Sequence, residues 1–221
     1  AKPCRHPAPT WKAACEPVSS PYGSPTRYDG SMRRTGGLEG ALHGGIDLSL
    51  REGTKLRAMA DGRVFAHGEG GRLEGIFVWL LHLPAESGVG FPFLAKYQHL
   101  SAPSALPVGR RVRAGEVVAL SGRSGTTGGH YGAEGYPHLH LAVRALTAEG
   151  ARLAAAGDEG FRLLRDTVLV DPLAIFVPGL ADPAQAAPLP EGRRRVAIAH
   201  VDDAGAPRPA GARVVWPVAC P

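Results

Sequence analysis

Two histidines, His138 and His140, lie two positions apart in an otherwise apolar segment of the chain. If this segment is a β-strand, both imidazoles point to one face, while Leu139, Leu141 and Val143 point to the other face and pack in a core. Imidazoles held side by side can bind a metal ion or transfer protons. The alternation therefore predicts a strand that places two such groups at a functional site.

A histidine and a carboxylate, His43 and Asp47, lie four residues apart and form a second candidate pair. Gly44 and Gly45 disfavour a helix between them, so we expect a turn that enters a strand. A catalytic zinc site has three protein ligands and an open fourth position, and imidazole and carboxylate groups are suitable ligands. The predicted zinc ligands are His43, Asp47 and His140.

His99 and His138 are the candidates for acid–base catalysis at this site. A hydrolytic zinc site needs a group that takes a proton from water and returns one to the leaving nitrogen. The chain lacks the HExxH motif, whose glutamate has that role in many zinc peptidases. Imidazole titrates near neutral pH and can replace the glutamate. For His99, the alternative is an exposed histidine at the end of a strand.

These side chains need short strands to position them, and the composition is typical of a β-rich fold. The 30 glycines and 20 prolines indicate many turns and few long helices. One short helix is expected within residues 146–165. The strands on either side of Asp61 and Gly62 are predicted to form a hairpin. Strands are expected over residues 46–48, 55–59, 63–66, 76–83, 91–100, 110–113, 116–120, 136–143 and 168–177.

Composition also divides the chain into three parts. Residues 1–17 are interpreted as an N-terminal arm, residues 18–177 as the main domain and residues 178–221 as a C-terminal extension. Within the extension, residues 195–201 and 213–218 are predicted to pair in a β-hairpin.

The length, charge and hydropathy of the chain limit its class. A chain of 221 residues can bury a full core in one domain with appendages. No apolar run approaches the roughly 18 residues of a membrane-spanning helix, so no membrane span is expected. The net charge of +5 and the pI near 9.4 favour an anionic partner such as an acidic wall polymer. Nucleic acid is not expected, because the basic residues lack interleaved aromatic residues and a known binding motif.

The three cysteines, Cys4, Cys15 and Cys220, lie near the two ends of the chain and form no CxxC pair. We interpret them as a source of at least one disulfide rather than as metal ligands, with one thiol left over. Disulfides persist in oxidising compartments, so a periplasmic or extracellular location in the cell envelope is predicted. The sequence leaves the pairing open.

Several ordered motifs resemble those of the lysostaphin-like, or LytM-type, zinc endopeptidases of bacterial cell walls, peptidase family M23. The resemblance covers roughly residues 18–177 and is carried by SSPYG at 19–23, HGGID at 43–47, GT at 53–54, ADGRV at 60–64, YQHLS at 97–101, RAGE at 113–116 and HLH at 138–140.

This resemblance implies an all-β fold with an antiparallel sheet core and a groove crossed by the site. It also implies zinc held by His43, Asp47 and His140, with His99 and His138 in catalysis. The implied substrates are peptide bonds of peptidoglycan, in stem-peptide cross-links or in bridges.

The chain differs from this family in one loop and at both ends. Residues 129–136 lengthen the loop before His138, and residues 1–17 and 178–221 have no counterpart in the minimal domain. These segments could cover the groove or bind a partner. Two alternatives to an endopeptidase are a non-catalytic regulator of another wall hydrolase, as some relatives are, and a zinc carboxypeptidase or amidase. Because all five site residues are present, an active endopeptidase is predicted.

Overall fold

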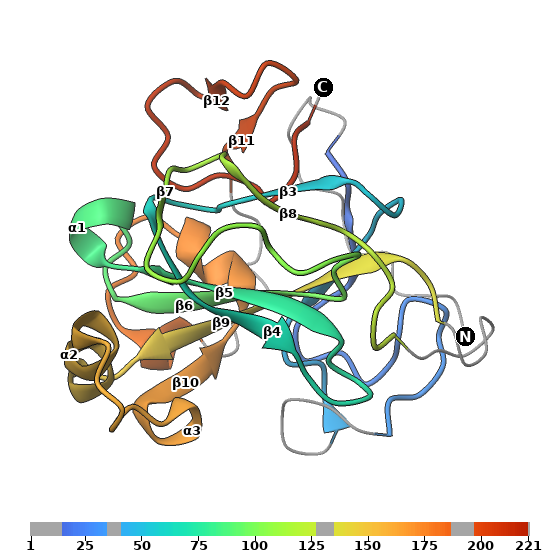
Figure 1. The fold of residues 1–221 in the computed structure, drawn as a ribbon. Coiled ribbons are helices and arrows are strands. Elements are labelled where there is room, and N and C mark those ends of the chain that lie inside the picture. Colours follow the sequence, from blue (N-terminus) through green and yellow to red (C-terminus); the bar gives the residue numbers. More distant parts are fainter. Residues whose placement is uncertain (1–14, 35–40, 127–134, 187–196, 221) are drawn as a thin grey trace.

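An eight-stranded antiparallel sheet forms the centre of the fold, which is described by a computed structural model (Figure 1). The structure describes residues 15–34, 41–126, 135–186 and 197–220. Two smaller sheets pair β3 (Lys55–Arg57) with β8 (Val117–Leu120), and β11 (His200–Val201) with β12 (Pro207–Arg208). This architecture confirms the predicted all-β, antiparallel fold class. The strands of the large sheet are β1 (Val18–Ser20), β2 (Ile46–Ser49), β4 (Gly62–Glu69), β5 (Ile76–His82), β6 (Phe93–Gln98), β7 (Arg111–Val112), β9 (His138–Leu146) and β10 (Thr167–Val170).

Helices are few and short, in agreement with the glycine and proline content. Thr147 begins α2, because its Oγ1 accepts a hydrogen bond from the Gly150 amide at 3.0 Å, and Gly157 ends it with a φ of 66°. Among the described residues, no helix is both long enough and apolar enough to cross a membrane. The α-helices are α1 (Pro84–Ser87), α2 (Ala148–Ala156) and α3 (Leu163–Asp166), and the 3-10 helices are η3 (Pro172–Phe176) and η4 (Pro183–Ala186).

The strand order β1-β2-β9-β6-β5-β4-β7 places β9 in the interior of the sheet. Along one edge of β9, β2 pairs with its first half and β10 with its second half, while β6 pairs along the other edge. His140 therefore has Asp47 of β2 opposite it on one side and Gln98 of β6 on the other. This register brings two candidate ligands, far apart in sequence, into direct apposition.

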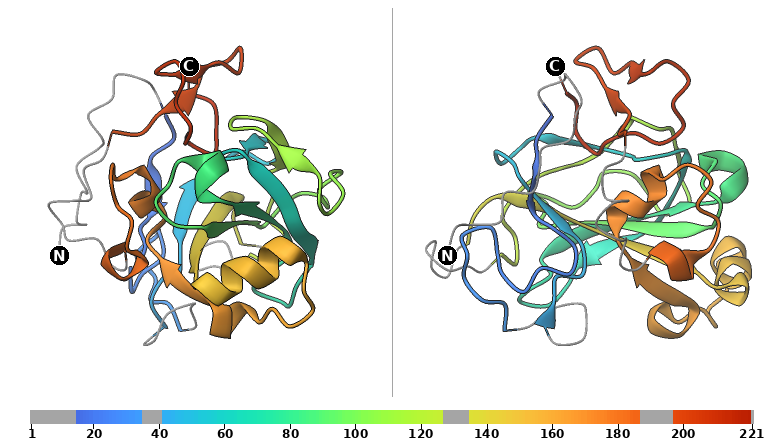
Figure 2. Two further views of the ribbon diagram at one scale, coloured as in Figure 1. Left: turned by 90° about the vertical axis from the view of Figure 1, so that its left-hand side faces the viewer. Right: turned by 180° about the vertical axis from the view of Figure 1, so that it is seen from behind.

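The two faces of the sheet differ in chemistry. Alternate side chains of β9, from Leu139 to Ala145, join the main hydrophobic core. The intervening positions point to the opposite face, where His138, His140 and Arg144 line a cavity. At one end of that face, α2 and α3 cover a second apolar cluster. Figure 2 shows the sheet between α2, in gold, and the C-terminal segment, in red.

The hairpin predicted around Asp61 and Gly62 is wrong in its pairing. Strand β3 pairs instead with β8, with Leu56 opposite Ala119, and β4 pairs with β5 and β7. Leu56 and Ala119 both join the main core, so this long-range pairing buries apolar surface that a local hairpin alone would leave exposed.

The C-terminal extension also pairs differently from the prediction. Its hairpin joins β11 to β12, while Val215 lies beside Met59 and donates its amide to the Met59 carbonyl at 2.7 Å. Trp216, 1% exposed, thereby enters the main core together with Ile198 and Val218. No described residue of the extension lines the cavity on the other face of the sheet. The division of the chain after residue 177 stays a prediction.

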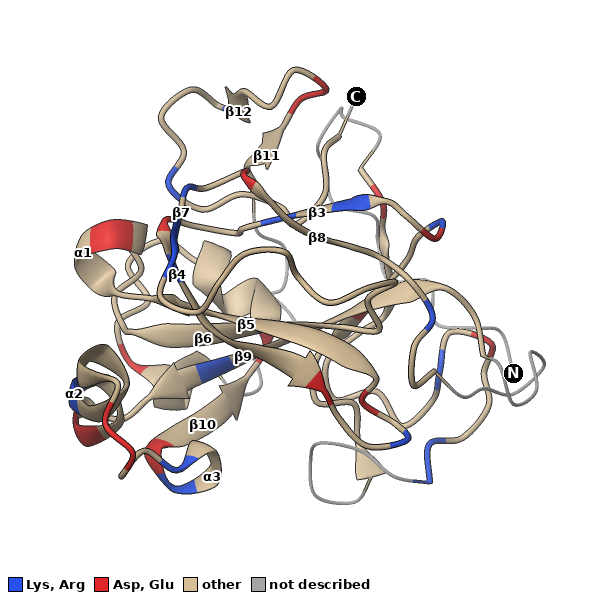
Figure 3. Ribbon diagram, in the orientation of Figure 1, with Lys and Arg blue, Asp and Glu red and all other residues tan. Residues whose placement is uncertain are grey.

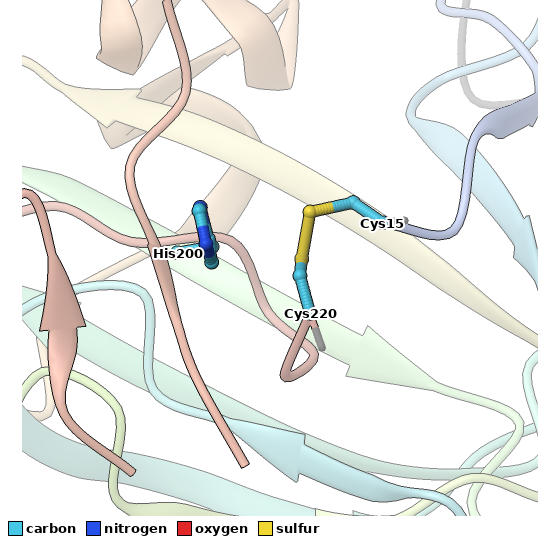
Figure 4. A group of neighbouring side chains, drawn as sticks. All are labelled: Cys15, His200 and Cys220. Atoms are coloured by element: carbon cyan, nitrogen blue, oxygen red, sulfur yellow. A yellow bond between two sulfur atoms is a disulfide. The ribbon is translucent and has the colours of Figure 1, made fainter. Parts of the chain in front are cut away.

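A disulfide joins Cys15 to Cys220 across a sequence separation of 205 residues, with Cα atoms 4.6 Å apart. Figure 4 shows His200 beside this bond. These three residues lie close enough to offer a metal site, but their two sulfur atoms are bonded to each other. The disulfide expected from the terminal cysteines is thus confirmed. Cys4 and most of the predicted arm lie outside the described residues, as does most of the lengthened loop before His138.

Charged residues of both signs are interspersed along the described ribbon (Figure 3). Strand β3 and α3, on opposite sides of the sheet, both carry basic residues, and α2 and α3 carry acidic residues as well. The excess of positive charge is therefore not confined to one face of the described structure.

Candidate functional site

Strands β2 and β9 bring Asp47 and His140 together at the centre of the candidate site. The two residues are directly opposite in an antiparallel pair, and His140 Nδ1 lies 2.9 Å from Asp47 Oδ1. Ile46 and Leu48, the neighbours of Asp47, are buried in the main core, so the alternation of β2 directs the carboxylate to the other face. Apolar packing on one face of the sheet thus fixes the polar pair on the other.

His43 reaches the same point from the segment before β2. Its backbone is held by the lead-in segment, because its amide donates to the Ser24 carbonyl and its own carbonyl accepts from the Gly23 amide. Its Nδ1 lies 3.0 Å from the Pro21 carbonyl oxygen, which identifies this nitrogen as the protonated one. Its Nε2 then presents a lone pair 3.0 Å from Asp47 Oδ1.

Three donor atoms therefore converge: His43 Nε2, His140 Nδ1 and Asp47 Oδ1 lie 2.9–3.0 Å from one another. Burial lowers the pKa of His140 to about 4, although Asp47 opposes this shift, so the imidazole is neutral at pH 7. Two imidazole nitrogens and a carboxylate oxygen this close repel one another unless a cation or a proton lies between them. The donor set fits a metal ion with bonds of about 2.0–2.2 Å.

The charge state of Asp47 agrees with this reading. The side chain is 3% exposed, and burial by itself would raise its pKa. The neighbouring imidazoles of His140 and His43 nevertheless hold the pKa of Asp47 well below its usual value, so the carboxylate is ionised. A buried carboxylate anion beside two imidazole nitrogens is an environment that a divalent cation stabilises.

Arg33 supports the carboxylate from the side and was not found by sequence reasoning. Its Nη2 lies 3.0 Å from Asp47 Oδ2 and 2.9 Å from the Ser20 hydroxyl. Arg33 thereby orients Asp47 through one oxygen and leaves Oδ1 to the imidazoles. An arginine in a turn-rich segment carries no spacing signal, so only the folded chain reveals this contact.

Gly45 permits the close approach of β9. A Cβ at this position would clash with the carbonyl oxygen of Leu141 and lie 2.9 Å from His140 Nε2. We expect Gly45→Ala to lower metal affinity at least about tenfold and to destabilise the fold by about 1–3 kcal/mol, because β2 and β9 must move apart. Metal titration and urea unfolding measure the two effects.

Gly68→Ala is the matched control for this change. Gly68 lies in β4 of the large sheet, but a Cβ there meets only the Phe77 ring at an ordinary 3.5 Å. We expect its metal affinity to equal that of the wild type. If Gly45→Ala bound metal as tightly as the wild type, that result would contradict the close packing of the segment before β2 on β9.

His138 lies beside the three donors without joining them. Its Nε2 is 3.8 Å from Asp47 Oδ1, and its Nδ1 lies 2.9 Å from the Tyr136 carbonyl oxygen. The Tyr136 ring stacks on the imidazole, with centroids 4.3 Å apart and planes inclined by 15°. Burial lowers the pKa of His138, so its imidazole is neutral at pH 7, with Nε2 as the proton acceptor.

His99 lies on the other side of His138, with ring centroids 4.6 Å apart. Its Nδ1 is 2.8 Å from the Ser124 carbonyl oxygen, and burial lowers its pKa to about 3. His99 has a φ of 64°, a left-handed conformation that, among the described non-glycine residues, only Ala41 shares. Such strain is found where a site requires it. His99 is 7% exposed, which excludes the alternative of an exposed strand-end histidine.

All five predicted residues line one cavity of about 760 Å³, here called the site cavity. Its floor is the sheet face formed by β9 and β6.

His82 lies outside this cavity and is a packing residue. It is fully buried, stacks on Phe93 and forms a hydrogen bond with the Asp61 carbonyl oxygen at 2.9 Å. Burial lowers its pKa to about 4.

Comparison with known proteins places the chain in a family. Residues 41–154 match the model of peptidase family M23. An uncharacterized metalloprotease of Haemophilus influenzae is 36% identical over 127 residues, which are 56% of this chain and 22% of that protein. The chain thus spans less than a quarter of that relative's length.

Two solved structures are also similar. The catalytic domain of the antimicrobial peptidase lysostaphin from Staphylococcus simulans is 26% identical, with a TM-score of 0.42, over 57% of this chain and 77% of that chain. A zinc-containing peptidase from Vibrio cholerae is 23% identical, with a TM-score of 0.43, over 62% of this chain and 36% of that chain.

Proposed function

We infer a function from the premise that this chain belongs to peptidase family M23, whose model matches residues 41–154. It is a metallopeptidase of that family with an intact His-Asp-His site. We propose that it is a zinc-dependent endopeptidase that hydrolyses peptide bonds of peptidoglycan. The observation that carries this proposal is the convergence of His43 Nε2, Asp47 Oδ1 and His140 Nδ1 beside two neutral imidazoles in one cavity.

Zinc is the proposed metal, with His43, Asp47 and His140 as its ligands. Two imidazoles and one carboxylate form a donor set that suits zinc, and one similar structure contains zinc. When bound, zinc supplies Lewis-acid polarisation of a carbonyl group and makes water more acidic. The Pro21 carbonyl and Arg33 orient these ligands in advance.

His99 and His138 have the proposed catalytic roles. In each, Nδ1–H donates a hydrogen bond to a backbone carbonyl oxygen, so Nε2 is free to accept a proton from the attacking water. Once protonated, an imidazole donates an N–H to the negative charge that develops on the peptide oxygen, or a proton to the leaving nitrogen. Two adjacent imidazoles can divide these tasks. A neutral imidazole accepts the proton from water, and a protonated one donates to the peptide oxygen or the leaving nitrogen.

The cell envelope is the proposed location. The Cys15–Cys220 disulfide supports an oxidising compartment, and peptidoglycan lies outside the cytoplasm. The alternative of a non-catalytic regulator gains no support from the site, because the metal donors and both neighbouring imidazoles are in place.

Digestion of purified peptidoglycan tests the proposal. The zinc-loaded protein should release soluble fragments with new amino termini, a chelator should stop the release, and added zinc should restore it. Mass spectrometry of the fragments identifies the cleaved bond and separates an endopeptidase from a carboxypeptidase or amidase. Stoichiometric zinc without cleavage of any wall substrate would refute the proposed activity.

Replacing either proposed catalytic histidine should separate turnover from metal binding. We expect His99→Ala and His138→Ala each to lower kcat by about 10²- to 10⁴-fold, the usual contribution of a positioned acid or base, and to keep a full equivalent of zinc. Rates and metal content are measured on the same samples. His67→Ala, on β4 outside the site cavity, is the control and should match the wild type. Loss of zinc from either variant would instead assign that histidine as a ligand.

A further inference from the structure

The site cavity extends beyond the proposed zinc ligands along β9 to Arg144. Positions 138, 140, 142 and 144 share one face of this strand, and all four line the cavity. Four residues of a strand span about 14 Å, so Arg144 lies roughly three to four residues along an extended peptide from the proposed cleavage point. A substrate that extends along β9 from the proposed cleavage point would pass this side chain.

The cations and anions of the site cavity are unevenly paired. Its described lining contains five cationic residues and two carboxylates. Asp47 is paired with Arg33, and Glu74 with Lys96. Among the described residues, no carboxylate lies within ion-pair distance of Arg144, which lines the same cavity as His140. Its positive charge is thus left for another partner.

The contacts of Arg144 orient it without using all of its donors. Nε donates to the Thr167 hydroxyl at 2.5 Å, and Nη2 approaches the Thr167 carbonyl oxygen at 3.4 Å. These bonds anchor the guanidinium to β10, and Nη1 has no hydrogen-bond acceptor among the described residues. Burial lowers the pKa of Arg144, because a guanidinium taken partly out of water loses hydration. An anion that entered the cavity would restore that lost stabilisation.

Lys96 adds a second cation opposite Ala142. Its ammonium group contacts the Glu74 carboxylate and lies over the Phe77 and Trp79 rings, 4.6 and 5.1 Å from their centroids. Burial and the charge of Arg144 lower the pKa of Lys96 to about 8, so it is mostly protonated at neutral pH. Glu74 already pairs with Lys96, so on the floor formed by β6 and β9 Arg144 is the cation that no described carboxylate neutralises.

We propose that Arg144 binds a carboxylate of the substrate, and that the enzyme therefore selects peptides carrying free carboxylates over uncharged bridges. The planar guanidinium suits a carboxylate, and such charge-assisted hydrogen bonds are the stronger class. Stem peptides of peptidoglycan carry free carboxylates, whereas a glycine bridge has none. This inference rests on the proposed endopeptidase activity and names the substrate class for it.

The test compares two substrates: a cross-linked muropeptide dimer with free carboxylates, and the same dimer with its carboxylates amidated. For the wild type, we expect KM to be about 10- to 100-fold lower for the carboxylate dimer, with similar kcat values. Arg144→Gln should raise KM for the carboxylate dimer to the value for the amidated dimer. KM for the amidated dimer should not change. Arg144→Lys, which keeps the charge, should recover part of the difference.

Arg152→Gln is the matched control, because Arg152 lies on α2, is exposed and pairs with Glu149 outside the site cavity. Its kinetics should equal those of the wild type. Equal KM values for the two dimers in the wild type would overturn the inference. An equal rise in KM for both dimers, in Arg144→Gln and in Arg144→Lys, would also overturn it. That result would indicate a structural role of Arg144 through Thr167.

Calorimetry separates this inference from the proposed function. If the zinc-loaded wild type cleaves neither dimer, the endopeptidase proposal fails, while binding of the two dimers still tests Arg144. Tighter binding of the carboxylate dimer that disappears in Arg144→Gln supports the carboxylate site. Equal binding of both dimers refutes it.

Discussion

Asp47→Asn should remove most of the bound metal and lower peptidoglycan hydrolysis more than about a hundredfold. Asp47 Oδ1 lies within 3.0 Å of both candidate imidazole ligands, and its charge is the only formal negative charge among the three donors. Changes to groups that merely orient a ligand typically cost 10- to 100-fold in metal affinity, so losing a charged ligand should cost more. Zinc content after dialysis and the initial rate of fragment release measure the effect.

Asp182→Asn is the matched control for this change. Asp182 is exposed and accepts a hydrogen bond from the Ala184 amide, outside the site cavity. It should keep full zinc and full activity. A dialysed Asp47→Asn protein with one equivalent of zinc would show that the convergent donors are not the metal site.

Removing the disulfide should have the largest effect on stability. Cross-linking residues 205 positions apart restricts the unfolded chain strongly, and the loop-entropy argument sets a ceiling of about 5 kcal/mol on the stabilisation. We expect the double variant Cys15→Ser/Cys220→Ser to lose about 3–5 kcal/mol of unfolding free energy in urea. The described C-terminal segment packs on the core face of the sheet, away from the site cavity. The kcat of the folded variant should therefore stay unchanged.

Reductant provides the internal comparison for this prediction. It should destabilise the wild type and Cys4→Ser to the level of the double variant, and leave the double variant unaffected. A wild type whose urea midpoint is the same with and without reductant would contradict a stabilising role for the Cys15–Cys220 bond.

The local pattern of β9 predicted much of the site. Leu139, Leu141 and Val143 alternate with His138 and His140, and the structure buries the first set while directing the second to the cavity. Burial of apolar side chains determines which face points inward, and the two-residue period then places every polar side chain. His43 and Asp47 were also expected near His140, and the structure brings them within 3.0 Å.

Strand pairing was less predictable where the partners are far apart. Strands β3 and β4 were expected to pair with each other, and they pair instead with β8 and with β5 and β7. The segment around Val215 was expected in a hairpin and lies beside Met59. Short strands of two to four residues carry little register information, so the burial of the whole core selects among their partners.

By itself, the sequence determined the chemistry available at the candidate site. It placed two imidazoles on one face of a strand, a histidine just before a second strand with a carboxylate within that strand, and a further histidine at the end of a third strand. These are properties of residue type and short spacing. Only the tertiary structure decided which atoms meet. The orientation of Asp47 by Arg33, the unpaired charge of Arg144 in the same cavity and the bond between Cys15 and Cys220 each join segments that no local period connects. Such contacts follow from the packing of the whole sheet, because each depends on how side chains from distant segments fill the space on the two faces of the sheet.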